Sequence, residues 1–342
     1  MGLHPCCAVI IRKKESRVTL RETKHIYVQP HRQEHPKIYI QFWSSIKRLL
    51  NWIGHDRLPD FAKVAMSVAE SAGHVSLQSE PYPIPAEECD EYIVMSANLW
   101  HDWPRFKDLE KRLEAFVALA ESERVDLILL QEIARTPNFK ADEWLAERLQ
   151  MAYVYSRANG SQKIGFEEGL GVYSRFPLKR VPYIRQMSQA HNPFSRRLAL
   201  GVEVDTPCGA IMAFSAHLGL MRRQNAKQLR ELHGWVKEIA SGRSAIIAGD
   251  FNAPEHSHQI KNIRSHWIDT FREIHEHGHS STHELRWPWG GVFLSHRLDY
   301  IFLQAGEPAW QVLDVQHIDA LRGPHSDHRA VLARLSPSHW VA

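Results

Sequence analysis

Between residues 91 and 336 short apolar runs follow one another with few amphipathic segments between them, and this order restricts the fold strongly. Three segments have the apolar spacing of amphipathic helices: 106–120, 141–149 and 222–240. The apolar runs 170–176, 197–204 and 210–218 succeed one another with no helical segment between them. Parallel strands need long crossovers, so this succession predicts an α/β domain with mixed sheets rather than a purely parallel one.

The start of the chain differs from this domain in charge and in pattern. Residues 1–63 contain 12 Lys/Arg and 5 Asp/Glu, a net charge of +7, whereas the whole chain carries +3. The stretch 79–90, SEPYPIPAEECD, has the proline and acidic composition of a linker. We therefore expect a basic N-terminal extension over 1–80 and a main domain over 90–336. A basic arm suits a phosphate-rich partner or an anionic surface, and the alternative is a solvated tail.

Residues 41–54, QFWSSIKRLLNWIG, predict a helix inside this extension. Its apolar side chains recur at helical spacing and form one stripe, with Lys47 and Arg48 on the opposite face. Two interpretations remain open. The stripe packs on the main domain, or it makes a peripheral contact with a membrane surface.

The four cysteines and the hydropathy indicate the compartment. Cys6, Cys7, Cys89 and Cys208 have neither the spacing of a zinc site nor that of a disulfide framework, which favours a reducing compartment. No apolar run approaches the roughly 18 residues of a transmembrane helix, and the N-terminus lacks the order of regions found in a signal peptide. We expect a cytoplasmic protein without a transmembrane segment.

Polar residues stand next to the ends of the predicted strands. They are Asn98, Glu132, His217, Asp250, Asn252, Asp299, Asp327 and His328. Each has an ordinary explanation alone, as a turn residue, a cap or a buried histidine with its partners. Together they predict one site, because functional groups of layered α/β folds gather where strands end in loops. Asp250 and Asn252 are two apart, so we expect their side chains on one face of a strand end.

These residue types suit metal-assisted attack on a phosphoester. Mg²⁺ prefers oxygen ligands and keeps several waters, so one or two carboxylates and an amide suffice. A phosphoryl transition state needs hydrogen-bond donors and positive charge around its oxygens, and His217 and Asn98 can supply donors. Asp250, Asn252 and His328 are suited to orienting and deprotonating a water molecule, and Asp299 to fixing a histidine tautomer. Zinc is disfavoured because it prefers histidine and cysteine ligands, and most of these residues are carboxylates and amides.

The ordered motifs SANLW, LLQEI, SAHLGL, AGDFNA, RLDYIF and SDHRAVL resemble the endonuclease/exonuclease/phosphatase superfamily, which has the DNase I-like fold. The resemblance covers roughly residues 90–336. It implies a four-layer α/β sandwich, in which two mixed β-sheets pack face to face with helices outside. It also implies one or two Mg²⁺ or Mn²⁺ ions.

The resemblance also implies a role for each motif residue. Glu132 is the principal metal ligand, with Asn98 beside it, and Asp327 contributes to the metal site. Asp250 positions or activates the nucleophile, and Asn252 contacts the phosphate and orients Asp250. His217 donates to the phosphate, and His328 pairs with Asp299. Glu168, seven residues before Arg175, matches the place where DNase I-like members have a glutamate partner for the histidine.

The expected activity is hydrolysis of phosphodiester or phosphomonoester bonds by a monomer, with nucleic acid as the first substrate. The alternative is hydrolysis of phospholipid, sphingomyelin or inositol phosphate at a membrane surface, and a third interpretation is a non-catalytic binding protein on the same fold. The apurinic endonuclease branch carries a Y-x-P-N motif where this chain has FSAHLGL, which argues against that branch. The segment 275–291 is either a substrate-contacting loop, stacking on bases or touching lipid, or an ordinary variable loop.

Overall fold

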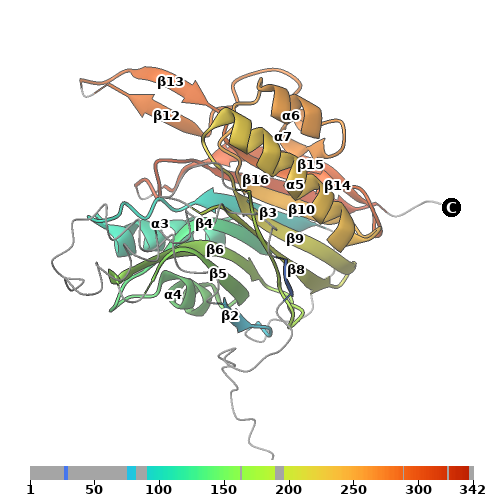
Figure 1. Ribbon diagram of the computed structural model, residues 1–342, viewed down its shortest axis with the longest axis horizontal. Helices are drawn as coiled ribbons and strands as arrows, with labels where there is room; N and C mark the ends of the chain where they lie inside the picture. Colours follow the sequence, from blue (N-terminus) through green and yellow to red (C-terminus); the bar gives the residue numbers. More distant parts are fainter. Residues whose placement is uncertain are drawn as a thin grey trace, which may run out of the picture.

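The computed structural model describes residues 27–29, 75–81, 91–161, 164–188, 196–287, 289–321 and 323–338 (Figure 1). The helix expected over 41–54 lies outside these residues. The strands are β1 (Tyr27–Gln29), β2 (Val75–Gln78), β3 (Tyr92–Asn98), β4 (Leu127–Arg135), β5 (Ala152–Ser161), β6 (Phe166–Ser174), β7 (Tyr183–Gln186), β8 (Leu198–Thr206), β9 (Gly209–His217), β10 (Ala245–Asp250), β11 (Ile268–Asp269), β12 (His283–Arg286), β13 (Val292–His296), β14 (Asp299–Gln304), β15 (Trp310–Ile318) and β16 (Ala330–Pro337). The helices are α3 (Leu109–Ser122), α4 (Ala141–Leu149), α5 (Arg222–Ala240), α6 (His258–Ile263) and α7 (Thr270–Ile274).

Within the described part of the chain the strands form two seven-stranded sheets and one separate hairpin. The first sheet has the order β15-β16-β3-β4-β6-β5-β2, and the second has the order β1-β7-β8-β9-β10-β14-β11. In each sheet a central pair is parallel, β3 with β4 and β9 with β10, while the strands flanking these pairs run antiparallel. The predicted mixed sheets are therefore confirmed.

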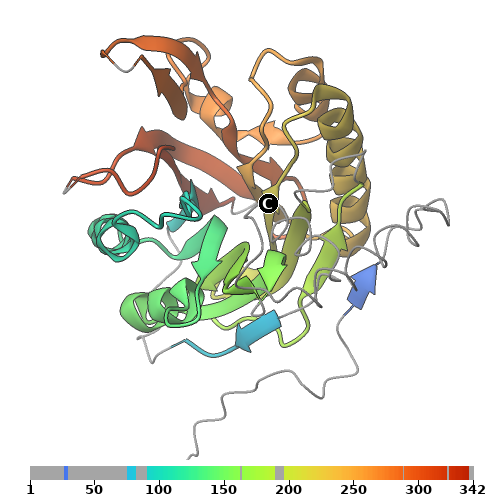
Figure 2. The same ribbon diagram turned by 60° about the vertical axis from the view of Figure 1, so that its left-hand side comes forward.

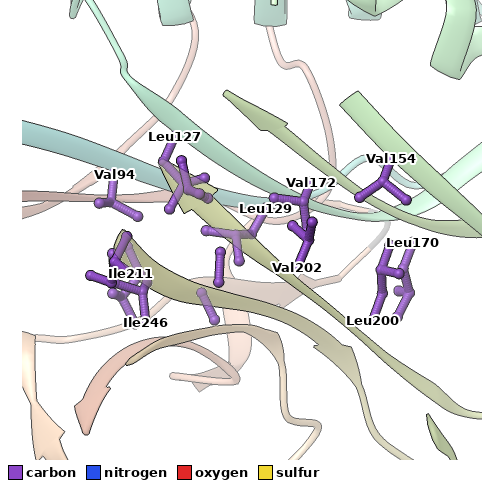
Figure 3. Packing of buried hydrophobic residues seen from close by; sticks show 14 of the residues in the cluster. Val94, Leu127, Leu129, Val154, Leu170, Val172, Leu200, Val202, Ile211 and Ile246 are labelled. Carbon is purple, nitrogen blue, oxygen red and sulfur yellow. The ribbon is translucent and has the colours of Figure 1, made fainter. Parts of the chain in front are cut away.

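The main core lies between the two sheets. Apolar side chains of β6 meet those of β8, and Figure 3 shows Val172 beside Val202 and Leu170 beside Leu200. These residues are buried and belong to one cluster that draws on both sheets. Removing this apolar area from water is the dominant favourable contribution to folding, so the contact fixes the two sheets against each other.

Helices cover the outer faces of both sheets. Leu113 and Phe116 of α3 and Leu145 of α4 pack on the first sheet. Leu232 and Trp235 of α5 pack on the second sheet, together with residues of α6. Figure 2 shows α3 and α4, in teal and green, on the opposite side of the molecule from α5, in gold. The predicted four-layer α/β sandwich is confirmed.

Two short strands within residues 1–80 join the sheets of the main domain. β1 pairs with β7 in parallel, and β2 pairs with β5 antiparallel. Val75 of β2 is buried, and the Leu178 N–H donates to the Ser79 carbonyl at 2.8 Å. The division into 1–80 and 90–336 stays a prediction, and the structure adds that β2 completes one edge of the first sheet.

Cys208 lies in the turn between β8 and β9 and is disulfide-bonded. The cysteine spacing gives no indication of this bond. In the described residues no helix is both long and apolar enough to cross a bilayer. The cytoplasmic localisation stays a prediction.

His317 of β15 is expected to make the fold less stable in acid. Its ring stacks on Phe271 at 4.2 Å, and its buried Nε2 has no hydrogen-bond partner in the described structure. Burial, and then the nearby Arg297 charge, lower the pKa of His317 from 6.5 to about 3. The unfolded chain therefore binds the proton more readily, and stability present above pH 6.5 is lost as the pH falls toward 3.

The measurement is thermal unfolding of wild type and His317→Phe at pH 7 and pH 5. We expect the variant to lose less stability than wild type on acidification, by at most about 2 kcal/mol. His277→Phe, at a histidine side chain that is 90% exposed, is the control. Equal acid sensitivity of wild type and His317→Phe would contradict the assignment.

Candidate active site

Asn98, at the end of β3, connects the ends of the two sheets. Its Nδ2 donates to Glu132 Oε1 and to Asp250 Oδ2, each at 3.2 Å. Its Oδ1 accepts the backbone N–H of Trp100 at 2.9 Å, and the residue is buried. Asn98 and Glu132 belong to the first sheet and Asp250 belongs to the second. The side chains predicted at separate strand ends therefore meet at one place.

A β-bulge aims Glu132 at this place. The pairing of β4 with β6 changes register between Leu130 and Ile133, and Glu132 has a φ of 57°. Its neighbour Gln131 is turned toward the second sheet, where its Nε2 donates to Ser215 Oγ at 3.2 Å. A bulge redirects a side chain that strict alternation would send elsewhere. Gln131 therefore contributes to the contact between the two sheets, and the next residue, Glu132, contributes to the site.

Strand register places three predicted residues side by side on the second sheet. Asp250, the last residue of β10, pairs with His217 of β9 on one side and with Asp299 of β14 on the other. All three side chains are buried. Burial and the charge of Asp299 raise the pKa of Asp250 to about 7. A carboxyl group with this pKa is suited to exchanging a proton near neutral pH.

Asn252 reaches Asp250 by a different route from the one expected. The strand ends at Asp250, and Asn252 has a left-handed backbone with a φ of 48°. Its backbone N–H donates to Asp250 Oδ1 at 2.8 Å, and its Nδ2 lies 3.2 Å from Oδ2. The explanation by alternation along a strand is wrong, because a turn brings the two residues together. The orienting role expected for Asn252 stays a prediction.

Asp299 and His328 form a buried ion pair. His328 Nδ1 lies 2.8 Å from Asp299 Oδ2, which also accepts the Thr282 hydroxyl at 2.6 Å. Burial lowers the pKa of His328, but the Asp299 carboxylate outweighs it and raises the pKa to about 10. His328 is thus a cation at neutral pH. The bond at Nδ1 leaves Nε2 available to a substrate oxygen.

His217 lies between Asp250 and Arg197, and the sequence motifs do not include Arg197. Its Nε2 lies 3.4 Å from Asp250 Oδ2, and Arg197 Nη1 lies 2.8 Å from the same nitrogen. Burial, followed by the Arg197 charge, lowers the pKa of His217 well below 6.5. His217 is therefore neutral, and Arg197 supplies positive charge beside it. Arg197 precedes β8, which pairs with β9, and this pairing brings it to the site.

Glu168 pairs with a histidine that we did not predict. His101 Nε2 lies 3.1 Å from Glu168 Oε2 and 3.6 Å from Glu132 Oε2. His101 Nδ1 accepts the Trp103 N–H at 2.9 Å, so Nε2 carries the proton. His101 follows Asn98 by three residues and comes directly after the SANLW motif, a signal that sequence reasoning could have used. Glu168 is thus paired with His101, and a pairing with one of the motif histidines stays a prediction.

Asp327 lies at the edge of the site. Its side chain is 42% exposed, accepts the Ser326 hydroxyl at 3.2 Å, and lies 3.9 Å from His283 Nε2. The ring of His283 contacts the ring of His328 at 4.5 Å. His283 is therefore a neighbour of both Asp327 and His328, and the sequence motifs do not include it. These contacts leave the metal role of Asp327 a prediction.

The sequence matches the model of the endonuclease/exonuclease/phosphatase family over residues 95–328. The chain belongs to this family. The uncharacterized protein YbhP of Escherichia coli K12 is 27% identical over 140 residues, which cover 37% of this chain and 53% of YbhP. The match thus spans about half the length of the curated relatives.

Solved structures with the family fold resemble the chain at low sequence identity. A family protein from Beutenbergia cavernae has a TM-score of 0.60 at 21% identity, covering 74% of this chain and 73% of its own. D. rerio TDP2, complexed with a single-strand DNA product, has a TM-score of 0.58 at 18% identity, covering 72% and 99%. The human Nocturnin catalytic domain, with bound sulfate, has a TM-score of 0.56 at 18% identity, covering 74% and 97%.

The family is typically dependent on a divalent metal, and the residues present fit one. Asp299 Oδ1 is buried without a hydrogen-bond partner in the described structure. Asp250, Asp299 and His328 offer ligand atoms within 4.8 Å of one another, as do His101, Glu132 and Glu168. Buried carboxylates in such numbers need cations to compensate their charge, and carboxylate oxygens are the ligands that Mg²⁺ and Mn²⁺ prefer.

Proposed function

We propose that this protein is a Mg²⁺- or Mn²⁺-dependent phosphodiesterase that activates a water molecule for attack on phosphorus. The observation that carries the proposal is the bridge by Asn98, whose Nδ2 lies 3.2 Å from both Glu132 Oε1 and Asp250 Oδ2. The bridge joins a metal-binding carboxylate of one sheet to a water-activating carboxylate of the other. Metal and nucleophile would thus act on the same phosphate.

Glu132 and Asn98 would hold the metal, with Asp327 as a further ligand. Asn98 presents its amide beside Glu132, at the same end of the first sheet. When bound, the ion supplies Lewis acidity toward the phosphoryl oxygens. His101 lies 3.6 Å from Glu132 and is joined to Glu168, so this pair would hold the Glu132 carboxylate in place.

Asp250 would accept the proton of the attacking water. The hydrogen bonds from the Asn252 backbone and side chain fix the orientation of the carboxylate. Its pKa of about 7 matches proton transfer near neutral pH, where a general base is most effective. This assignment keeps the role expected from the motif.

Three groups would stabilise negative charge on the phosphate. His328 is cationic through its pairing with Asp299, and Arg197 presents a guanidinium beside His217. His217, being neutral, would donate a hydrogen bond from a ring N–H. Donors and cations held in place before the reaction give the largest stabilisation, because they need no reorganisation in the transition state.

The substrate is proposed from the phosphodiester class, with nucleic acid or a phospholipid headgroup as its two candidates. D. rerio TDP2, of similar fold, is complexed with a single-strand DNA product, which supports nucleic acid. An exposed aromatic hairpin beside His328, described below, supports a lipid. A non-catalytic binding protein is disfavoured because the full set of motif residues is present.

The test is a turnover screen of the full chain with Mg²⁺, Mn²⁺ or a chelator. The substrates are single- and double-stranded DNA, RNA, sphingomyelin, phosphatidylcholine and inositol phosphates, and Glu132→Gln is the blank. We expect turnover of at least one phosphodiester that the chelator abolishes and the blank lacks. Turnover that persists with chelator and with Glu132→Gln would contradict a metal-dependent site at Glu132.

A further inference from the structure

The β12–β13 hairpin and its turn gather exposed apolar side chains. In the described part of the chain 13 large apolar side chains are exposed, and six of them belong to this hairpin. They are Leu285, Trp287, Trp289, Val292, Phe293 and Leu294, with exposed fractions from 39% to 80%. Figures 1 and 2 both show the hairpin, in orange, standing away from the body. A contiguous exposed apolar patch of this kind marks an interaction site.

The apolar side chains of the hairpin tip form a joined cluster. Leu285 pairs with Leu294, so these two side chains share one face, and the register then shifts so that Arg286 pairs with Val292. The Phe293 ring lies 4.5 Å from the ring of Trp287. Trp287 in turn stacks on Trp289 at 5.2 Å. These contacts place exposed apolar rings together at the tip, which suits immersion in an apolar medium.

The charge of the tip argues against nucleic acid as its partner. Residues 285–294, LRWPWGGVFL, contain one arginine, no lysine and no acid. A protein that follows a nucleic-acid backbone needs several cations spaced along the phosphates. A zwitterionic lipid surface makes no demand for net charge, and Trp is enriched where membranes meet water.

The size of the tip argues against a second protein chain. A stable protein–protein interface has about 20–30 residues on each side. The tip presents six exposed apolar side chains on a two-stranded projection. A narrow projection of this kind matches a deformable bilayer better than the broad complementary surface that a protein partner requires.

The base of the hairpin is joined to the active site. His283 forms a β-bridge with His328, and Thr282, next to the start of β12, donates to Asp299. Arg329 donates from its backbone to the Thr282 carbonyl at 2.8 Å.

The length of the hairpin matches the thickness of the headgroup layer. Four residues separate the base from the tip on β12, a reach of roughly 13 Å at 3.3 Å per residue. The headgroup layer of one leaflet is about 5–8 Å thick. A tip immersed through it would hold His328 near the phosphates.

We propose that the tip of the β12–β13 hairpin inserts into the surface of a lipid bilayer and holds the active site at the lipid headgroups. The insertion is driven by burial of apolar side chains and does not depend on anionic lipid. The placement of the active site at the lipid headgroups rests on the proposed function, and the insertion of the tip does not. Binding can therefore be tested without turnover.

The experiment measures binding of the full chain to phosphatidylcholine vesicles by cosedimentation, with chelator present. We expect binding that does not fall between 0.1 and 0.5 M salt, a range in which electrostatic contacts between exposed groups are screened. Trp287→Ser/Trp289→Ser should lower the partition coefficient by at least about tenfold, because two aromatic side chains lose their apolar surface. Vesicles of brominated phosphatidylcholine should quench tryptophan fluorescence in wild type more than in this variant.

The control is Leu313→Ser/Val181→Ser, which removes two exposed apolar side chains outside the hairpin. It should bind within twofold of wild type, and circular dichroism melts should be alike for both double variants. Glu132→Gln should bind as wild type does, so that loss of catalysis and loss of docking are separate results. Equal binding by wild type and the tip variant, or no binding by wild type, would overturn the proposal. The proposal would also be overturned if the tip variant kept its binding to vesicles but lost binding to an oligonucleotide or lost self-association.

Discussion

Glu132→Gln is expected to lower metal-dependent turnover by about 10³-fold with little change in folding. The substitution keeps the shape of a side chain that is 20% exposed and removes the charge that would hold the ion. Positioning and Lewis acidity by a metal contribute several kcal/mol to a transition state, and each 1.4 kcal/mol is a factor of ten. The measurement is kcat/KM as a function of Mg²⁺ concentration on whichever substrate the screen identifies.

Glu143→Gln is the matched control for this prediction. Glu143 of α4 has a side chain that is 39% exposed and pairs with Lys140. Its replacement removes the same charge without touching the site, so turnover should stay within twofold of wild type. Thermal melts with and without Mg²⁺ should show that the ion stabilises wild type and the control more than Glu132→Gln. Activity of Glu132→Gln within threefold of wild type would exclude Glu132 as the metal ligand.

Asp299→Asn and His328→Ala are each expected to lower kcat by about 10²–10⁴-fold. His328 Nδ1 lies 2.8 Å from Asp299 Oδ2, and the carboxylate is what keeps the imidazole cationic. Removing either residue therefore removes the same positive charge from the phosphate site. The measurement is turnover of both single variants and the double variant at saturating Mg²⁺.

The double variant separates a functional pair from two independent structural roles. Residues that act as one unit have non-additive effects, so the double change should cost little more than the worse single change. Losses that multiply would instead mean that the two side chains act separately. Thr282 also donates to Asp299, so Thr282→Val is a useful comparison. This substitution removes one hydrogen bond to the carboxylate and keeps the ion pair. We therefore expect it to lower turnover much less than Asp299→Asn does.

Much of the fold could be predicted from local patterns. The mixed sheets follow from apolar runs that succeed one another without helices, and α3, α4 and α5 follow from the 3.6-residue spacing of their apolar side chains. These signals depend on neighbours a few residues away. The hairpin β12–β13 did not follow from the sequence, because its exposed apolar residues contact solvent and have no burial pattern. In the sequence it is only an aromatic-rich loop.

The members of the site could be predicted better than their geometry. Asn98, His217 and Asp250 were expected at strand ends and are found there. Asn252 was expected on the strand and lies in a left-handed turn, because the strand stops at Asp250 and an asparagine tolerates this backbone. A β-bulge directs Glu132 into the site, and the apolar pattern of the sequence does not indicate this bulge.

By itself, the sequence determined the layered α/β fold and the set of polar residues at strand ends, because periodicity and strand termination are local properties of the chain. Only the tertiary structure decided which of these residues meet and which others join them. Arg197 and His217 are adjacent because β8 and β9 pair antiparallel, and Asn98 reaches Asp250 across 152 residues because the two sheets pack face to face. Such contacts depend on the register of strands and the packing of sheets, which are set by the burial of the whole core at once.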